Sequence, residues 1–417
     1  MDISNRKRVA VIGAGPSGIF VLRRLSANPD FHLKCFEKND TIGGQWCYTD
    51  KTVDDFGRPV HTAVYYYLKT NLPKQLMEIN GFPMDDYPAF PDHRQVLQYI
   101  NKLADTFNIR KYIKFNVDIK DVHPTNTSEP NTTWTISYEN TKQPFDVHTE
   151  EFDIVIVCTG AYTTPIFPTV ENEGDFQGLI LHSSCYRRPE VFAGKVVAVL
   201  GAGFSGVDIC FEVSSYAKKV YLCHQKQQLE TRLPDNVNEK ISTFKKYTSC
   251  SVILENGEEL TIDAVIYCTG YKHDFAVLPK GMITVDKRAR VNNLFMQIIF
   301  RHYSSIFLMG ANPFSSPFFL LADQQALFIA SVLEGSANLP SQREIKAIIE
   351  RESKKPEATK LWWEYLNELS EITDRCQSVP PALIKLWDRH FKVWDTHFDK
   401  CRTLSYKIID RDNIIQL

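Results

Sequence analysis

The apolar and polar positions near the start of the chain predict a strand, a helix and a second strand. The β-branched run Arg8–Ile12 is typical of a buried parallel strand, Ser17–Ala27 has helical spacing, and His32–Phe36 predicts the next strand. Between the first strand and the helix lies the glycine-rich turn G-A-G-P-S-G, from Gly13 to Gly18. A glycine turn in this position is typical of a dinucleotide-binding βαβ unit.

The first unit also has the residue types that bind the parts of a dinucleotide. A helix N-terminus binds a pyrophosphate through its backbone N–H groups and the helix dipole. Glu37 follows the second strand about 20 residues after the glycines, where a carboxylate accepts hydrogen bonds from the adenosine ribose. A βαβ unit without a nucleotide is the alternative, and the agreement of turn, helix and acid disfavours it. The candidate cofactor-binding residues of this unit are Gly13, Gly15, Ser17, Gly18 and Glu37.

A second unit of the same kind follows in the middle of the chain. Lys195–Leu200 predicts a strand, Ser205–Ala217 a helix and Val220–Cys223 a further strand. The turn between the first strand and the helix is G-A-G-F-S-G, from Gly201 to Gly206. Two dinucleotide units in one chain suit an enzyme that moves hydride from a nicotinamide to a flavin. We expect the second pyrophosphate at Gly201, Gly203, Ser205 and Gly206.

The second unit lacks an acid at its ribose position, which favours NADPH as its nucleotide. Its last strand ends in the sequence C-H-Q-K, residues 223–226. A carboxylate there would repel a phosphate on the ribose, whereas a nearby cation attracts it. His224 and Lys226 are therefore candidate phosphate contacts. Alternatively, Lys226 is an ordinary solvated surface charge.

Two similar segments, Phe152–Gly160 and Ile262–Gly270, each predict a strand that returns to its sheet and stops at a glycine. The sequence therefore predicts an α/β fold with two Rossmann-like dinucleotide-binding domains, the smaller inserted in the larger, and a helical C-terminal segment. Trp134–Tyr138 predicts a small antiparallel excursion, Ser305–Gly310 a return to the first domain, and the region from Ser341 onward helices. The expected division is residues 1–175 for the first part of the FAD-binding domain, 176–275 for the NADPH-binding domain, and 276–417 for the second part of the FAD-binding domain with the C-terminal helices.

Composition and charge exclude several classes of protein. The chain has 417 residues, of which 43% are hydrophobic and 24% charged, as in soluble globular proteins. A net charge of -2 gives no basic surface for nucleic acid, and no apolar run reaches the ~18 residues that a membrane span needs. The polar start leaves no room for a secretory signal, so we expect a cytoplasmic location. The ten cysteines form no C-x-x-C pair, which indicates reduced thiols, and we expect no metal.

A longer motif stands before the second glycine turn. Phe176–Arg187 matches F-x-G-x-x-x-H-x-x-x-[FY]-[KR], which is typical of flavin-containing monooxygenases, members of the class B flavoprotein monooxygenases. Gly43–Trp46 resembles the family's turn beside the flavin, Leu68–Lys74 its catalytic asparagine segment, and Cys268–Tyr271 its [AC]-T-G-Y turn. The resemblance covers most of residues 5–330. Within the family, the chain is most similar to the short insect enzymes, which include the pyrrolizidine-alkaloid (senecionine) N-oxygenases.

This resemblance implies cofactors, a reaction and site residues. FAD and NADPH together activate molecular oxygen and transfer one of its atoms to a nucleophilic nitrogen or sulfur. The resemblance implies Asn71 as the catalytic residue, in contact with the cofactors. From the residues alone, an Asn two places before Pro73 is equally an ordinary turn former. Phe204 departs from the Asn common in this family's second turn. The residues implied to line FAD are Gln45, Trp46, Thr70 and Gln324.

The expected substrate is a small-molecule nucleophile, first a tertiary amine such as a pyrrolizidine alkaloid and then a thioether. A Baeyer–Villiger ketone monooxygenase is an alternative, although its related motif usually ends in Trp where this chain has Tyr186. An NADPH oxidase and a non-catalytic redox sensor are further alternatives. A flavin disulfide reductase is disfavoured because Cys47 has no nearby cysteine partner in the sequence. The oligomeric state stays open, with a homo-oligomer among the alternatives.

Overall fold

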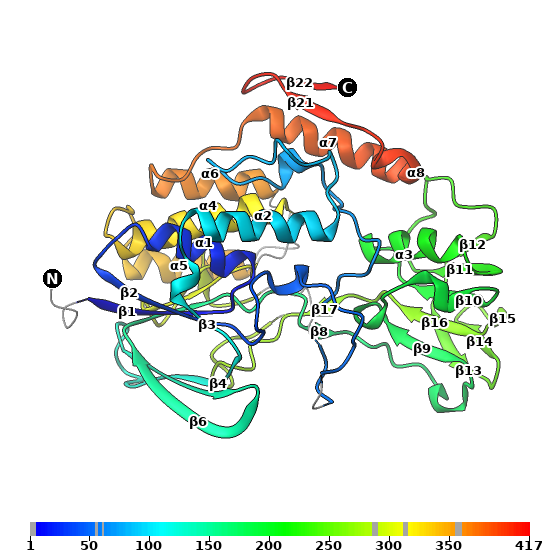
Figure 1. Ribbon diagram of the computed structural model, residues 1–417, viewed down its shortest axis with the longest axis horizontal. Coiled ribbons are helices and arrows are strands. Elements are labelled where there is room, and N and C mark those ends of the chain that lie inside the picture. The colour runs from blue at the N-terminus through cyan, green and yellow to red at the C-terminus, as the bar shows by residue number, and fades with distance from the viewer. Residues whose placement is uncertain (1–5, 55–56, 61, 286–290, 312–315, 355–360) are drawn as a thin grey trace.

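Two mainly parallel β-sheets, one for each glycine turn, organise the computed structural model (Figure 1). The structure describes residues 6–54, 57–60, 62–285, 291–311, 316–354 and 361–417. The first sheet contains, in spatial order, β18 (Leu294–Phe295), β19 (Ile299–Phe300), β20 (Ile306–Leu308), β7 (Ile154–Val157), β1 (Lys7–Ile12), β2 (Phe31–Phe36) and β3 (Ile113–Lys114). The second contains β12 (Val237–Lys240), β11 (Lys219–Cys223), β10 (Val196–Leu200), β16 (Ala264–Tyr267) and β9 (Leu179–His182).

The first sheet is covered on both faces. Successive residues of a strand face opposite sides, so Val9 and Val11 of β1 pack among helices, while Ala10 and Ile12 face a three-stranded antiparallel sheet. That sheet confirms the antiparallel excursion and consists of β4 (Val117–Pro124), β5 (Trp134–Asn140) and β6 (Gln143–Phe152). The helices of the first core are α1 (Pro16–Leu25), α2 (His93–Thr106), α4 (Phe318–Leu333), α5 (Gln342–Ser353) and α6 (Trp362–Ile372).

The second sheet repeats this arrangement on a smaller scale. Val197 and Val199 of β10 pack under α3 (Phe204–Ser214), and Ala198 and Leu200 face another antiparallel sheet. A short antiparallel pair, β8 (Thr164–Pro165) with β17 (Tyr271–Lys272), connects the two halves. The antiparallel sheet of the second half is formed by β13 (Phe244–Tyr247), β14 (Ser251–Leu254) and β15 (Glu259–Thr261).

The C-terminal part of the chain contacts both halves. Helix α7 (Pro381–Thr396) places Leu386 in the helical core of the first half and Trp394 in the core beneath α3. Helix α8 (Phe398–Cys401) continues along the second half. Figure 1 shows this orange and red segment running from the α6 side of the molecule toward α3.

Some predicted element ends differ from the structure. The first helix stops at Leu25 rather than Ala27, and the second spans Phe204–Ser214 rather than Ser205–Ala217. The region from Ser341 onward is not helical to its end, because it closes with a hairpin. Asp410 builds the turn of that hairpin by accepting hydrogen bonds from the backbone N–H groups of residues 412 and 413. The hairpin strands are β21 (Tyr406–Ile408) and β22 (Ile414–Gln416).

The predicted fold class is confirmed: two Rossmann-like units lie in one α/β chain, and a largely helical C-terminal segment covers them. The domain boundaries after residues 175 and 275 stay predictions. No helix within the described ranges combines the length and the apolar character that crossing a membrane requires. The cytoplasmic location and the oligomeric state stay predictions.

Candidate active site

The first glycine turn lies at the carboxyl end of β1, where the backbone leaves no room for side chains. Gly13 has a φ of +102°, and a Cβ there would lie 2.7 Å from the Cys158 carbonyl oxygen. A Cβ on Gly18 would lie 1.9 Å from the Gly13 carbonyl oxygen, so only glycine lets α1 start this close to the strand. Gly15 is the N-cap of α1, and Ser17 is buried in its first turn. The first N–H groups of α1 have no intrahelical partner, which fits a dinucleotide pyrophosphate.

Glu37 lies beside this turn at the end of β2. Its Oε2 accepts a hydrogen bond from the Ala14 N–H group (2.7 Å), and its Oε1 accepts one from the Asn39 N–H group (2.9 Å). Burial raises the pKa of Glu37, and these backbone donors oppose the rise. The structure thus holds the Glu37 carboxylate against the first glycine turn, a position that fits the predicted contact with a ribose.

The glycine pair Gly43 and Gly44 packs directly on the first glycine turn. The Gly43 N–H group donates to the Ala14 carbonyl oxygen (3.0 Å). A Cβ on Gly44 would lie 2.9 Å from the Cα of Gly15, so the two turns touch backbone to backbone. This contact explains the glycine pair and brings residues 43–46 to the first nucleotide site.

Gln45 and Trp46, both expected to line the flavin, follow this pair. Gln45 Nε2 donates to the Tyr162 carbonyl oxygen (3.2 Å), in the segment that follows β7. The Trp46 ring meets Phe319 of α4 edge to face, with the centroids 6.0 Å apart. The two side chains therefore tie the turn to the sheet and to α4, and both are only partly buried.

The second glycine turn repeats the geometry of the first. Gly201 has a φ of +112°, and a Cβ on Gly206 would lie 1.9 Å from the Gly201 carbonyl oxygen. A Cβ on Gly203 meets nothing within 4 Å, so the side of the turn that faces away from the sheet is open. Ser205, in the first turn of α3, is exposed on that side. An open glycine turn before exposed helical N–H groups fits a second pyrophosphate.

The two candidate phosphate contacts have different surroundings. Lys226 is exposed, and its Nζ donates to the Ala202 carbonyl oxygen (3.0 Å) in the second glycine turn. His224 is only 3% exposed, and its Nε2 lies 2.9 Å from Oε1 of Glu239. Its Nδ1 has no hydrogen-bond partner among the described residues. The structure therefore brings Lys226, rather than the His224 ring, to the accessible side of the turn.

Asn71 and Thr70 lie in the loop that precedes α2. Thr70 is buried, and its hydroxyl donates to the Leu72 carbonyl oxygen (2.8 Å), so it braces the loop from inside. Asn71 Oδ1 accepts a hydrogen bond from Nη2 of Arg402 (2.8 Å). The Asn71 carbonyl oxygen contacts Nε2 of His390 (2.6 Å). The C-terminal segment thus contacts Asn71 twice, at the side-chain Oδ1 and at the backbone carbonyl oxygen.

Sequence interpretation missed two residues that contact the candidate Asn71, Arg402 and His390. Arg402 Nη1 also donates to Oδ1 of Asp208 on α3 (2.5 Å), so one guanidinium connects Asn71 with the helix of the second nucleotide unit. The sequence gives no local signal for this contact, because Arg402 lies 331 residues after Asn71 and beyond the motif-bearing region.

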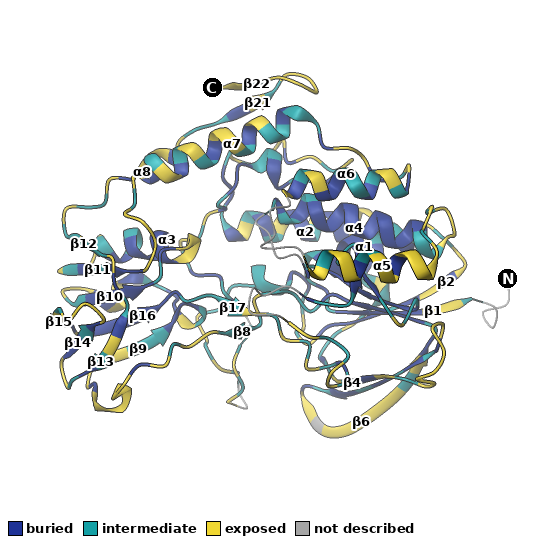
Figure 2. Cartoon of the chain, turned by 180° about the vertical axis from the view of Figure 1, so that it is seen from behind, coloured by how far each residue is buried: buried dark blue, intermediate teal, exposed yellow. Residues whose placement is uncertain are grey.

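Gln324 lies in α4, a helix that is buried along most of its length (Figure 2). Its Oε1 accepts a hydrogen bond from the Gln377 N–H group (3.0 Å), which directs it to the C-terminal segment. The neighbouring Gln325 is the residue that accepts from the Gly310 N–H group (3.4 Å). The structure thus places Gln325, and not Gln324, at the Gly310 turn.

Two residues of the Phe176–Arg187 motif, His182 and Tyr186, hold parts of the second half together. His182 is buried, and its Nε2 contacts the Gly270 carbonyl oxygen (3.2 Å). The Tyr186 hydroxyl donates to Glu212 Oε2 on α3 (2.9 Å). These contacts give the motif a structural role within the second half.

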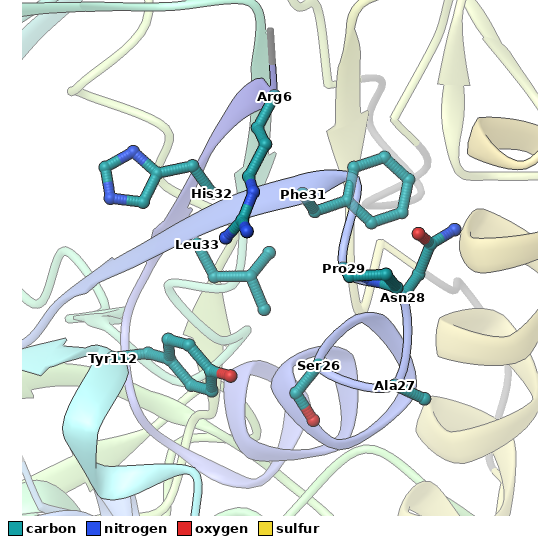
Figure 3. Close-up of a pocket in the computed structure, with 9 residues that line it drawn as sticks. All are labelled: Arg6, Ser26, Ala27, Asn28, Pro29, Phe31, His32, Leu33 and Tyr112. Carbon is teal, nitrogen blue, oxygen red and sulfur yellow. The ribbon is translucent and has the colours of Figure 1, made fainter. Parts of the chain in front are cut away.

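One surface cavity lies away from both glycine turns. Its volume is about 290 Å³, and its lining includes Arg6, Ser26 and Tyr112 (Figure 3). It sits at the amino ends of β1 and β2, whereas nucleotides bind at the carboxyl ends of parallel strands. The cavity is therefore separate from the candidate active site.

Comparisons with known proteins agree with this geometry. A family model described as "Flavin-binding monooxygenase-like" matches residues 6–229 and 229–412. The chain belongs to this family. The predicted enzyme class, flavin-containing monooxygenase, is thereby confirmed, as are the predicted cofactors FAD and NADPH.

Individual relatives of this flavin monooxygenase span most of its length. It is 31% identical to the Flavin-containing monooxygenase FMO GS-OX-like 1 of Arabidopsis thaliana over 81% of this chain and 74% of that protein. It is 30% identical to the Trimethylamine monooxygenase of Roseovarius nubinhibens over 88% of this chain and 86% of that protein. The solved structure of the S-allyl-L-cysteine S-oxygenase from Allium sativum matches with a TM-score of 0.85 and 26% identity, over 95% of each chain.

Proposed function

We propose that this flavin monooxygenase N-oxygenates tertiary amines, with pyrrolizidine alkaloids of the senecionine type as the first candidates and thioethers as the second. Support comes from relatives whose names specify an amine, trimethylamine, and a thioether, S-allyl-L-cysteine. Each has a nucleophilic atom, nitrogen or sulfur, with a lone pair that can accept an oxygen atom. An amine and a thioether thus share the chemistry that the proposed reaction needs.

We assign the two cofactors to the two glycine turns. FAD occupies the first, with its pyrophosphate at the start of α1, its ribose on Glu37, and its ring near Gln45, Trp46 and Thr70. NADPH occupies the second, with its pyrophosphate at the start of α3 and its ribose phosphate near Lys226. Support comes from the close backbone contacts at Gly18 and Gly206 and from the open side of Gly203.

The observation that carries the proposal is the position of Asn71. Its carboxamide belongs to the first half of the chain and is joined through Arg402 to Asp208 on the nucleotide-binding helix α3. It therefore stands where the two cofactor units meet. An amide at this point donates hydrogen bonds without adding an acid that would compete for protons.

The bound cofactors supply the redox chemistry, since NADPH and FAD together activate molecular oxygen. The chain itself positions them and excludes water. Glu37 would hold the adenosine end of FAD, and the turn at Gly43 and Gly44, packed on the first glycine turn, would help to hold the cofactor there. Asn71 would offer its Nδ2 donor to the bound cofactors, and the shape of the space beside them would decide which nucleophile enters.

The test measures NADPH consumption together with product formation for a panel of substrates. The panel contains a senecionine-type alkaloid, trimethylamine, a simple thioether and a cyclic ketone. We expect one N-oxide per NADPH with at least one tertiary amine and no ester from the ketone. Turnover of the ketone alone would indicate the Baeyer–Villiger alternative. NADPH oxidation that yields only hydrogen peroxide with every substrate would indicate an oxidase or a sensor.

A further inference from the structure

The C-terminal segment 390–402 contacts the candidate catalytic loop at two points. Helix α7 and the residues after it pack on the first core at one end and beneath α3 at the other. His390 and Arg402, at the two ends of the segment, both contact the loop that carries Asn71. The segment is therefore in a position to hold that loop and α3 in a fixed relation.

His390 holds the backbone of the loop. It is fully buried, and its ring packs against Phe90, with the centroids 5.4 Å apart. Burial lowers the pKa of His390 to about 4, so the ring is neutral at pH 7. A carbonyl oxygen only accepts hydrogen bonds, so Nε2 carries the proton and donates it to the Asn71 carbonyl oxygen at 2.6 Å.

Arg402 holds the side chain of Asn71 and the loop beside it. Its Nη2 donates to Asn71 Oδ1 (2.8 Å), and its Nε donates to the Thr70 carbonyl oxygen (3.2 Å). The same Nη2 lies 3.4 Å from the Lys69 carbonyl oxygen. The planar guanidinium thus donates hydrogen bonds to three consecutive residues. A lysine ammonium is a compact point charge and cannot reproduce this arrangement of donors.

The other side of the guanidinium is bound to α3. Nη1 donates to Asp208 Oδ1 (2.5 Å), and the second oxygen of that carboxylate accepts from the Tyr65 hydroxyl. The Asp208 side chain is 5% exposed and that of Arg402 is 19% exposed. Water therefore screens this ion pair weakly, and its geometry is well defined.

These contacts fix which end of the Asn71 carboxamide reaches the reaction site. Oδ1 accepts a hydrogen bond from Arg402, and Nδ2 is the other branch of the planar carboxamide. A free Asn side chain would exchange the two ends by rotation. With Oδ1 held, the donor end alone is presented.

We propose that Arg402 is a positioning residue that sets the orientation of Asn71 and couples it to the NADPH-binding helix through Asp208. This inference rests on the proposed catalytic role of Asn71. Loss of the guanidinium then lets the carboxamide turn, and NADPH oxidation becomes uncoupled from oxygen transfer to the substrate.

The test compares Arg402→Lys with wild-type enzyme and with the control Arg375→Gln. Arg375 pairs with Glu334 in the same C-terminal region and has no contact with Asn71 among the described residues. Bound flavin absorbance, thermal unfolding, KM for NADPH, and the ratio of N-oxide to hydrogen peroxide are measured for each. We expect Arg402→Lys to retain FAD and to lower the N-oxide to peroxide ratio about tenfold, as for one lost charged hydrogen bond. The Arg375→Gln ratio stays at the wild-type value.

A second comparison separates positioning from a general structural role. If Arg402 acts through Asn71, adding Arg402→Lys to Asn71→Ala lowers the ratio no further. Additive losses, or a wild-type ratio in Arg402→Lys, overturn the inference. If Arg402→Lys does not fold, Asp208→Asn replaces it, because it removes the charge that holds Arg402 while keeping the side-chain shape. Here too a wild-type ratio overturns the inference. Absence of N-oxide from the wild-type enzyme overturns the proposed function instead.

Discussion

Hydrogen bonds within the protein hold the individual residues of the site in place, from backbone groups for Glu37 and from the side chains of Arg402 and His390 for Asn71. Glu37 is fixed by two N–H groups, and Asn71 is fixed through its Oδ1 and its carbonyl oxygen. Lys226 rests on the second glycine turn through the Ala202 carbonyl oxygen. Each residue therefore has a defined direction before a cofactor binds, which lowers the cost of ordering it.

Substitution of Asn71 tests whether its Nδ2 donor is the active group. Asp at this position has the same shape and still accepts from Arg402, but it has no N–H donor. We expect Asn71→Asp and Asn71→Ala to keep bound FAD and to lose N-oxide formation by roughly 100-fold, as when one preorganised donor is removed. Product formation and flavin absorbance are measured together. Unchanged turnover in either variant removes Asn71 from the mechanism.

Substitution of Lys226 tests the preference for NADPH. Loss of one charged contact to the ribose phosphate corresponds to about a tenfold increase in KM. We therefore expect Lys226→Ala to raise KM for NADPH and to leave KM for NADH unchanged. Lys245→Ala, an exposed lysine on β13 of the same half, serves as the control. Equal changes in KM for NADPH and for NADH would show that Lys226 does not contact the ribose phosphate.

At the scale of elements, α3 combines two acids on one face. Asp208 and Glu212 are one turn apart, and they contact Arg402 and Tyr186 respectively. Burial raises the pKa of Glu212 to about 8, and the Asp208 charge adds to the rise, while Tyr186 and Arg402 oppose it. The helix thus holds an acid, Glu212, whose charge depends on pH, one turn away from the carboxyl group that pairs with Arg402.

This arrangement predicts a pH-dependent stability. Between the ordinary value of 4.5 and about 8, the folded protein keeps a proton on Glu212 that the unfolded chain has released. The free energy of unfolding therefore falls as the pH rises through this window. We expect Glu212→Gln to flatten the dependence of Tm on pH across this window, whereas the exposed control Glu255→Gln retains it. Parallel pH profiles for wild-type enzyme and Glu212→Gln would contradict the assignment.

Helix α7 explains why Phe204 stands in the second glycine turn. The Phe204 ring lies 5.8 Å from that of Phe391 and 5.4 Å from that of Trp394, both on α7. An Asn at this position could not form these aromatic contacts. The departure from the usual family residue thus accompanies the docking of the C-terminal segment on α3.

Replacement of Phe204 tests this docking. Each aromatic pair contributes about 0.5–1.5 kcal/mol, so we expect Phe204→Asn to lower the free energy of unfolding by about 1–3 kcal/mol. Phe204→Leu retains apolar contact without the ring and should lose less. Both are measured by denaturant unfolding. An Asn variant as stable as wild type would show that these contacts do not secure α7.

At the scale of the whole molecule, the parts predicted from sequence are those that local geometry dictates. Gly13 and Gly18 are required where the first turn of α1 approaches the end of β1. Their spacing, together with the predicted strands and helix and with Glu37, therefore identified the first nucleotide unit. The C-terminal hairpin could also have been predicted locally, from the turn that Asp410 forms. The helical spacing of the preceding residues led us to expect helix there instead. Both features are short-range.

The parts that sequence did not predict depend on distant contacts. Arg402 meets Asn71 across 331 residues, and no spacing rule connects them. Gln324 and Gln325 are neighbours, and only the packing of α4 decides which one reaches Gly310. Which of His224 and Lys226 reaches the accessible side of the second glycine turn likewise depends on a distant contact, because the His224 ring pairs with Glu239 of another strand.

The central claim is that one chain holds FAD and NADPH close enough for hydride transfer. The most direct measurement is an anaerobic titration of the purified, FAD-reconstituted protein with NADPH, followed by the visible absorbance of the flavin. We expect the protein to carry the flavin band and one equivalent of NADPH to bleach it. Protein that acquires no flavin band on reconstitution, or a band that NADPH leaves unchanged, would contradict the central claim.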